Sequence, residues 1–165
     1  MRRTRSGLCD ESGVGLRRAF LFLLAVVLDV TTKAAARSLL AGASVPLPFG
    51  ARLSLHLNPG VAFGMAGAWG WLLGLGGIGI LLFLTYVDPP AREPGGIGVS
   101  LLWAGGLSNA VERVLLGGVT DFLYLPAPFT PFPGLFVNLA DVWIGIGACL
   151  SMAALLFENR EARKP

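Results

Sequence analysis

The chain has 165 residues, of which 54% are hydrophobic and only 14% charged. Soluble domains average about 25% charged residues, and the apolar residues here also stand in long blocks, so the composition excludes an ordinary soluble domain and predicts one membrane-embedded domain. The net charge of +3 comes from basic residues that flank the apolar blocks, which argues against nucleic-acid binding and is typical of cytoplasmic anchors.

Four apolar blocks are each long enough to cross a hydrocarbon core about 30 Å thick. They run over residues 16–40, 62–87, 97–116 and 135–157. We therefore expect an all-α membrane protein with four transmembrane helices and a small β-sheet or loop region outside the cytoplasm. In this interpretation one transmembrane domain covers residues 16–157, between an N-terminal tail (1–15) and a C-terminal tail (158–165).

The basic residues indicate how the spans are oriented. An even number of spans places both termini on one side, and that side carries nine of the arginines and lysines against four on the other. Because cytoplasmic segments are enriched in these residues, we expect both termini and the turn at 88–94 to be cytoplasmic. A cleaved twin-arginine signal starting at Arg17-Arg18 is the alternative for the first block. Asp29 and Lys33 argue against it, because they interrupt the part of a signal that should stay apolar.

Two segments are predicted to lie outside the cytoplasm. Residues 52–58 alternate between polar and apolar side chains, which is the period of a half-buried strand, so we expect a small sheet on the outer membrane surface. Residues 126–133 form a loop rich in proline and aromatic residues, which we place in the headgroup region.

Cysteine and histidine usage offers no further site. Cys9 lies in the polar tail and Cys149 inside the last apolar block, so a disulfide between them is not expected. His56 is the one histidine, and zinc-protease motifs such as H-E-x-x-H are absent, so no metal site is predicted.

Polar and ionisable side chains within the apolar blocks are costly in lipid and need a reason. They gather near the outer ends of the spans, at Asp29, Lys33, Asn109, Glu112, Arg113, Asn138 and Asp141. At 1.5 Å per residue, Asp141 is expected roughly 9 Å below the outer end of its span, and Asn109 roughly 10 Å below the end of its own. The polar groups are therefore predicted to form one layer that faces outward.

Most members of this layer have a structural explanation. Asp29 and Lys33 stand four residues apart and can pair along one helix face. We expect Glu112 and Arg113 to neutralise each other as well. Asparagines such as Asn58 more often complete hydrogen bonds than react.

Asp121 and Asp141 differ from the other acidic residues, because neither has a basic residue within four positions. If they meet, the two carboxylates share one proton and titrate with one low and one high apparent pKa. The ionised member can then take a proton from water while the protonated member polarises a peptide carbonyl, which is aspartyl protease chemistry. A proton relay, or helix capping by Asp141, would use the same residues. A serine protease built from Ser108 and His56 is disfavoured, because no G-x-S-x-G elbow surrounds Ser108.

Four ordered motifs resemble those of lipoprotein signal peptidase, also called signal peptidase II. They are Asp29-Val30-Thr31-Thr32-Lys33, Asn58-Pro59-Gly60-Val61-Ala62-Phe63-Gly64, the stretch from Gly105 to Arg113 with its continuation Gly117-Gly118-Val119-Thr120-Asp121-Phe122, and Asn138-Leu139-Ala140-Asp141. The similarity extends from about Leu16 to Phe157 and includes the number of spans and the sizes of the loops.

The resemblance implies an aspartyl endopeptidase of the bacterial inner membrane whose active site lies near the extracytoplasmic face. Such enzymes remove the signal peptide from prolipoproteins that carry a diacylglyceryl group, and they cut just before the lipidated cysteine. It implies Asp121 and Asp141 as the catalytic pair. It also implies a set of supporting or substrate-binding residues, namely Asp29, Lys33, Asn58, Gly60, Asn109, Glu112, Arg113 and Asn138. We further expect the protein to be a monomer in contact with membrane lipid. It is expected to need no metal or organic cofactor and to be inhibited by globomycin.

The chain departs from the family pattern at a few positions, which are Ser108, Glu112, Val137 and Val142. Glu112 stands where aspartate is usual, so the charge is kept but a methylene is added, and its pairing with Arg113 or Lys33 is expected to be displaced. Two alternatives remain: a small proton-coupled transporter, and a non-catalytic member that binds prolipoproteins. The lack of ionisable residues in the inner half of the spans argues against a relay across the membrane.

Overall fold

The computed structural model describes residues 5–59, 95–127 and 134–162, together with isolated helical positions between 75 and 85. Within the first and last of these ranges, side chains are described from residue 13 and up to residue 157. Most of the predicted span at 62–87, the turn at 88–94, Gly60 and the loop at 128–133 lie outside the described residues.

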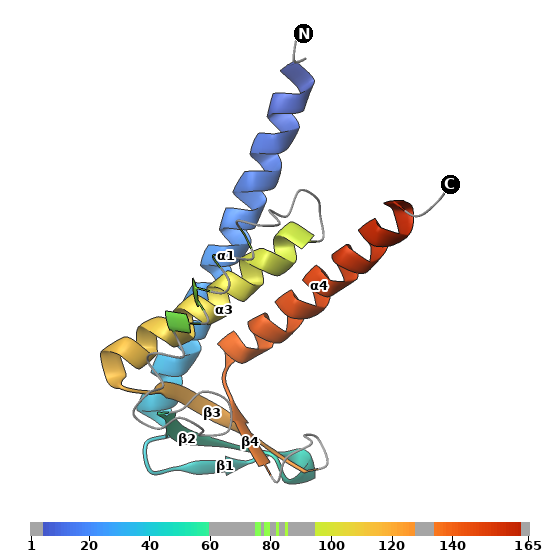
Figure 1. Cartoon of the computed structure of the whole chain (residues 1–165). Helices are drawn as coiled ribbons and strands as arrows, with labels where there is room; N and C mark the ends of the chain where they lie inside the picture. The colour runs from blue at the N-terminus through green and yellow to red at the C-terminus, as the bar shows by residue number, and fades with distance from the viewer. Residues whose placement is uncertain are drawn as a thin grey trace.

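Three long helices run from a small sheet toward the end that carries both termini (Figure 1). They are α1 (Arg5–Leu39), α3 (Gly95–Leu116) and α4 (Leu139–Ala162). Two helical stretches of the described residues are long and apolar enough to cross a membrane, Gly13–Leu39 and Leu139–Phe157.

Large apolar side chains on these helices face outward. On α1, Leu16 is 75% exposed and Phe20 61%, and on α4 Phe157 is 64% exposed. Soluble proteins rarely expose continuous apolar surface of this kind, so the faces of both helices suit contact with lipid rather than with water.

Glycines hold α3 close against α4. A Cβ atom on Gly147 of α4 would lie 2.6 Å from the backbone oxygen of Gly98 on α3, and one on Gly105 would lie 2.4 Å from the backbone oxygen of Ala140. Such distances leave no room for a side chain, so the backbones meet directly, as small residues permit in membrane helices. Gly105 and Gly147 therefore serve the packing of the two helices, whereas a Cβ on Gly145 would meet nothing within 4 Å.

The expectation of an all-α protein is wrong, because the chain also forms a four-stranded antiparallel sheet in the order β1-β2-β3-β4. The strands are β1 (Ser44–Pro46), β2 (Arg52–Asn58), β3 (Val119–Pro126) and β4 (Gly134–Val137), and a short 3₁₀ turn (Pro48–Gly50) links the first two. The strand predicted at 52–58 is confirmed. The other strands pair with it and with one another, which satisfies backbone groups that would otherwise lie unpaired.

The sheet is tied to the helices at two short connections. Gly117 ends α3 with a φ of +71°, a conformation that glycine adopts at little cost, and the chain then enters β3 directly. At the other connection β4 runs into α4 with only Asn138 between them. The predicted span at 135–157 therefore starts too early, because residues 135–137 pair with β3.

Candidate active site

Asp121 lies near the start of β3 with only 2% of its surface exposed. Its carboxylate accepts hydrogen bonds from two asparagine amides that come from different elements. The Nδ2 of Asn138 lies 2.7 Å from Oδ1, and the Nδ2 of Asn58 on β2 lies 3.1 Å from Oδ2. The asparagines therefore fix the orientation of Asp121, as the sequence predicted for residues that complete hydrogen bonds.

Asp141 lies in the first turn of α4, where the expected depth of roughly 9 Å is wrong because the helix starts at Leu139. Its Oδ2 accepts the backbone N–H of Asn138 at 3.0 Å, and its own N–H donates to Oδ1 of Asn138 at 3.1 Å. This reciprocal arrangement caps the helix. Oδ1 of Asp141 accepts a further bond of 3.0 Å from Asn109 on α3. The side chain is half-buried.

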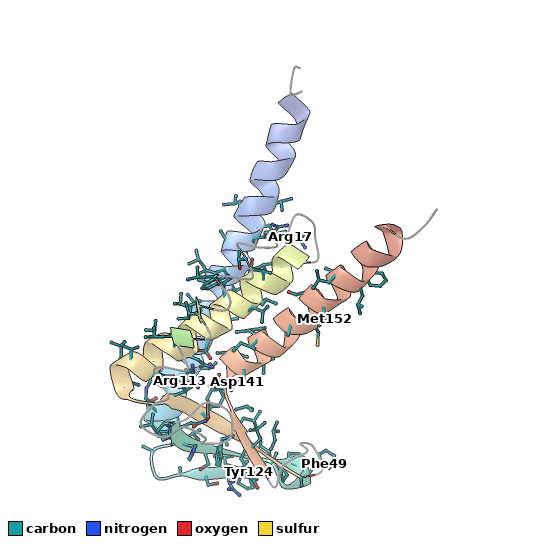
Figure 2. The ribbon with its side chains drawn as sticks, in the orientation of Figure 1. Arg17, Phe49, Arg113, Tyr124, Asp141 and Met152 are labelled. Carbon is teal, nitrogen blue, oxygen red and sulfur yellow. The ribbon has the colours of Figure 1, made fainter. Side chains whose placement is uncertain are left out.

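Asn138 joins the two aspartates. Its side-chain amide donates to Asp121 while its backbone N–H donates to Asp141. Figure 2 shows Asp141 at the end of α4 nearest the sheet, with Arg113 close by. The structure thus brings together Asp121 and Asp141, which lie on different elements and had no local sequence signal linking them.

Burial raises the pKa of Asp121 to about 6, and the neighbouring charge of Asp141 acts in the same direction. The hydrogen bonds from Asn58 and Asn138 oppose the rise, because they stabilise the ionised form. A carboxyl group with this pKa can hold a proton in mildly acidic surroundings, which is a property that a shared-proton pair requires.

Lys33 is a buried cation at the centre of the supporting residues, with 2% of its surface exposed. Its ammonium group lies 2.8 Å from Asp29 and 3.2 Å from Glu112, and it donates to Oδ1 of Asn109 at 2.6 Å. The predicted Asp29–Lys33 pair is confirmed. Because Asn109 also donates to Asp141, Lys33 is connected to the aspartate pair through a single side chain.

Asp29 fastens α1 to the start of α4. Its Oδ1 accepts the backbone N–H of Ala140 at 2.7 Å, and its Oδ2 accepts the hydroxyl of Ser108 at 2.5 Å. The serine-protease alternative finds no support, because Ser108 donates to Asp29 while His56 stacks on Phe136 with ring centroids 4.7 Å apart.

Glu112 pairs directly with Lys33 and Arg37, and its charge also acts on Arg113, so the predicted mutual neutralisation of Glu112 and Arg113 is one part of a larger cluster. Neighbouring residues on a helix point about 100° apart, so Glu112 faces α1 and not the residue beside it. Arg113 approaches the backbone oxygen of Asn109 at 3.4 Å and interacts electrostatically with both aspartates.

Two members of the site were missed by the sequence interpretation. Arg37 donates to Glu112 and, at 2.8 Å, to the hydroxyl of Thr120, while Thr120 donates its own N–H and hydroxyl to Glu112 at 3.1 and 2.7 Å. Arg37 follows Lys33 by four residues, so a third charge on the same face of α1 was the available signal. Thr120 precedes Asp121 directly, and its bonds to Glu112 hold the start of β3.

A model of the signal peptidase (SPase) II family matches residues 21–157 of the chain. The chain belongs to the signal peptidase II family. Members of this family are aspartic-type peptidases of membranes, and the resemblance stated for the four motifs is confirmed.

Lipoprotein signal peptidases from other bacteria are similar to this chain over most of its length. The lipoprotein signal peptidase of Staphylococcus carnosus is 30% identical over 149 residues, which cover 87% of this chain and 92% of the relative. The lipoprotein signal peptidase of Brucella ovis is 35% identical over 138 residues, which cover 79% of this chain and 84% of the relative.

Two solved structures described as bacterial membrane enzymes share the fold. The first matches with a TM-score of 0.75 and 27% identity, covering 90% of this chain and 93% of that one. The second matches with a TM-score of 0.69 and 28% identity, covering 85% and 92%. The agreement over nearly the whole length extends the family relationship to the three-dimensional structure.

Proposed function

We propose that this signal peptidase II removes signal peptides from prolipoproteins with Asp121 and Asp141 as its catalytic pair. The observation that carries the proposal is their connection through Asn138, whose side chain bonds one aspartate at 2.7 Å and whose backbone bonds the other at 3.0 Å. Carboxylates held this way can share a proton and act on one water molecule.

The surroundings of the two carboxyl groups suggest their roles. Asp121 is the proton-holding member, because it is almost fully buried whereas Asp141 is half-buried, and because burial raises the pKa of Asp121 to about 6. Asp141 is the ionised member, because it lies in the first turn of α4, where two N–H donors and the helix dipole favour negative charge. Its half-buried side chain also leaves a path for water.

The reaction follows from these roles. Asp141 takes a proton from water, and the resulting hydroxide attacks the carbonyl carbon of the scissile bond while Asp121 donates its proton to the carbonyl oxygen. The tetrahedral intermediate then collapses as the C–N bond breaks. The leaving amine receives the proton that Asp141 holds, and a hydroxyl of the intermediate returns a proton to Asp121 as the product carboxyl group forms. No covalent link to the enzyme forms, and no metal or organic cofactor takes part.

The supporting residues hold the pair in place. Lys33 balances Asp29 and Glu112 and orients Asn109, while Arg113 adds a positive charge near both aspartates. Preorganised polar groups of this kind stabilise charge during the reaction without having to rearrange. Gly60, which lies outside the described residues, is included as a substrate-binding position on the resemblance alone.

The membrane arrangement is part of the proposal. One domain over residues 16–157 crosses the inner membrane four times, and the tails at 1–15 and 158–165 are cytoplasmic. The sheet and the aspartate pair then lie at the extracytoplasmic end, in keeping with their position opposite the termini in Figure 1. The scissile bond precedes a diacylglyceryl-modified cysteine, whose lipid chains remain in the bilayer beside a monomeric enzyme.

A cleavage assay with the purified protein tests this function. A precursor with a diacylglyceryl cysteine and the same precursor without the lipid are incubated with the enzyme, with and without globomycin. We expect cleavage of the lipidated precursor only, at the bond before the cysteine, and its loss in globomycin. Equal cleavage of both precursors would contradict the proposed substrate class.

A further inference from the structure

The sheet carries a row of stacked side chains that the proposed chemistry does not use. The guanidinium of Arg52 lies 3.9 Å from the ring centroid of Tyr124, the rings of Tyr124 and Phe136 are 5.1 Å apart, and those of Phe136 and His56 are 4.7 Å apart. We call these four side chains, from β2, β3 and β4, the cation–aromatic row. Figure 2 places Tyr124 on the sheet, away from the helices.

The row lies along β2 and β3, and starts at the register position of Asp121. His56 is the cross-strand partner of Asp121, and Arg52 is the partner of Tyr124 further along the same two strands. The register of β2 shifts between Leu53 and His56, so these two positions span the three residues from Asp121 to Tyr124 on β3, which corresponds to about 10 Å of extended chain. A peptide whose first residue lies by His56 and that extends over the sheet therefore reaches Arg52 about three residues later, at its fourth residue.

The row holds the guanidinium group of Arg52 at the protein surface. A Cβ atom on Gly134 would lie 2.4 Å from the Tyr124 hydroxyl oxygen, so the glycine leaves the space that the tyrosine ring occupies. Arg52 is exposed, and in the part of the chain that the structure describes no carboxylate lies within ion-pair distance of it. Stacking uses the flat face of a guanidinium and leaves the N–H donors at its edge available for a carboxylate.

We propose that the cation–aromatic row binds the first residues of the mature chain, and that Arg52 favours an acidic side chain about four residues after the cleaved bond. This inference rests on the proposed function. The signal peptide lies in the membrane and the mature chain leaves toward the outside, so the sheet is the surface that this chain meets first. The aromatic rings supply contact area for any sequence, and the arginine adds selectivity for charge.

The test uses lipidated precursors with a single aspartate at each of positions two to six after the cleaved bond, compared with the same precursors carrying asparagine. The enzymes are the natural chain, Arg52→Met, which removes the charge but keeps the length, and Arg52→Lys, which keeps the charge but loses the planar fork. Arg17→Met, on the part of α1 that Figure 2 shows away from the sheet, controls for the loss of one exposed positive charge.

For the natural enzyme and for Arg17→Met, we expect kcat/KM to be about fivefold higher with aspartate near position four, a factor that corresponds to about 1 kcal/mol for an exposed charge-assisted pair. Arg52→Met should lose this preference, so that it cleaves the aspartate and asparagine precursors at equal rates, and Arg52→Lys should show an intermediate preference.

Equal cleavage of all precursors by the natural enzyme would overturn the inference and leave the proposed function intact, whereas no cleavage of any precursor would overturn both. If Arg52→Met slowed the aspartate and asparagine precursors equally, and only in vesicles of anionic lipid, Arg52 would instead contact lipid headgroups, and the inference would be wrong.

Discussion

Replacing Asn138 with alanine removes the residue that joins the two aspartates. Three hydrogen bonds involve this residue, but the variant loses only the two that use its side chain. These are the 2.7 Å bond to Asp121 and the 3.1 Å bond from the N–H of Asp141, while the backbone bond to Asp141 remains possible. The change therefore separates the side chain's effect on each aspartate.

The variant should change both the stability of the protein and its pH dependence. Loss of an asparagine helix cap destabilises a protein by about 1 kcal/mol, so the first turn of α4 should be less stable. A hydrogen bond to a charged group contributes about 1.5–3 kcal/mol, and one pKa unit corresponds to about 1.4 kcal/mol. Loss of the bond from Asn138 should therefore raise the pKa of Asp121, and with it the pH at which activity falls, by about one unit or more. The direction is upward because the lost bond favours the ionised form of Asp121. Looser positioning of the carboxylates should also lower kcat by about 10²-fold.

The assay is a profile of kcat/KM between pH 4.5 and 9 for the natural enzyme, Asn138→Ala and Asn138→Ser. Serine caps helices well but is too short to reach Asp121, so it should restore thermal stability without restoring either the rate or the pH limb. A variant Asn138→Ala with near-normal rate and an unmoved upper limb would refute the role assigned to this side chain.

Three further predictions concern proton balance, charge and packing. Because burial raises the pKa of Asp121 to about 6, the shared proton is lost above that value, and kcat/KM should fall as the pH rises from 6 to 8; a flat profile would contradict this reading. Lys33→Met leaves the buried Asp29 without its ion-pair partner and Glu112 with Arg37 alone, and should destabilise the fold by about 3–5 kcal/mol, measured as a lower thermal unfolding temperature in detergent; an unchanged temperature would count against the buried network. Gly105→Ala places a methyl group 2.4 Å from the backbone oxygen of Ala140 and should displace the start of α4, with a large loss of cleavage, whereas the control Gly145→Ala, which meets nothing within 4 Å, should cleave normally; equal activity of the two would contradict the packing account.

Much of the site follows from local patterns in the sequence. Asp29 and Lys33 stand four residues apart within an apolar block, so their pairing at 2.8 Å required only helical geometry. The alternation over residues 52–58 likewise gave a strand that the structure contains. Both inferences depend on short-range periodicity, which the sequence displays directly.

Other features depend on contacts between distant segments. Polar and apolar side chains do not alternate regularly along β3. Asp121, near its start, is buried because β2 and the start of α4 cover it. The pairing of Glu112 with Arg37 was not predicted, because the two residues lie on different helices. The start of α4 was placed four residues early because Leu135, Phe136 and Val137 are apolar in a strand and in a helix alike.

The most direct test of the catalytic pair is the cleavage of a lipidated precursor by Asp121→Asn and Asp141→Asn. Asparagine keeps the shape of each side chain but can neither hold the shared proton nor accept one from water. Both variants should insert in the membrane in normal amounts, keep the unfolding temperature within a few degrees, and lose cleavage by at least about 10³-fold. Cleavage near the natural rate by either variant would show that water is activated by other groups.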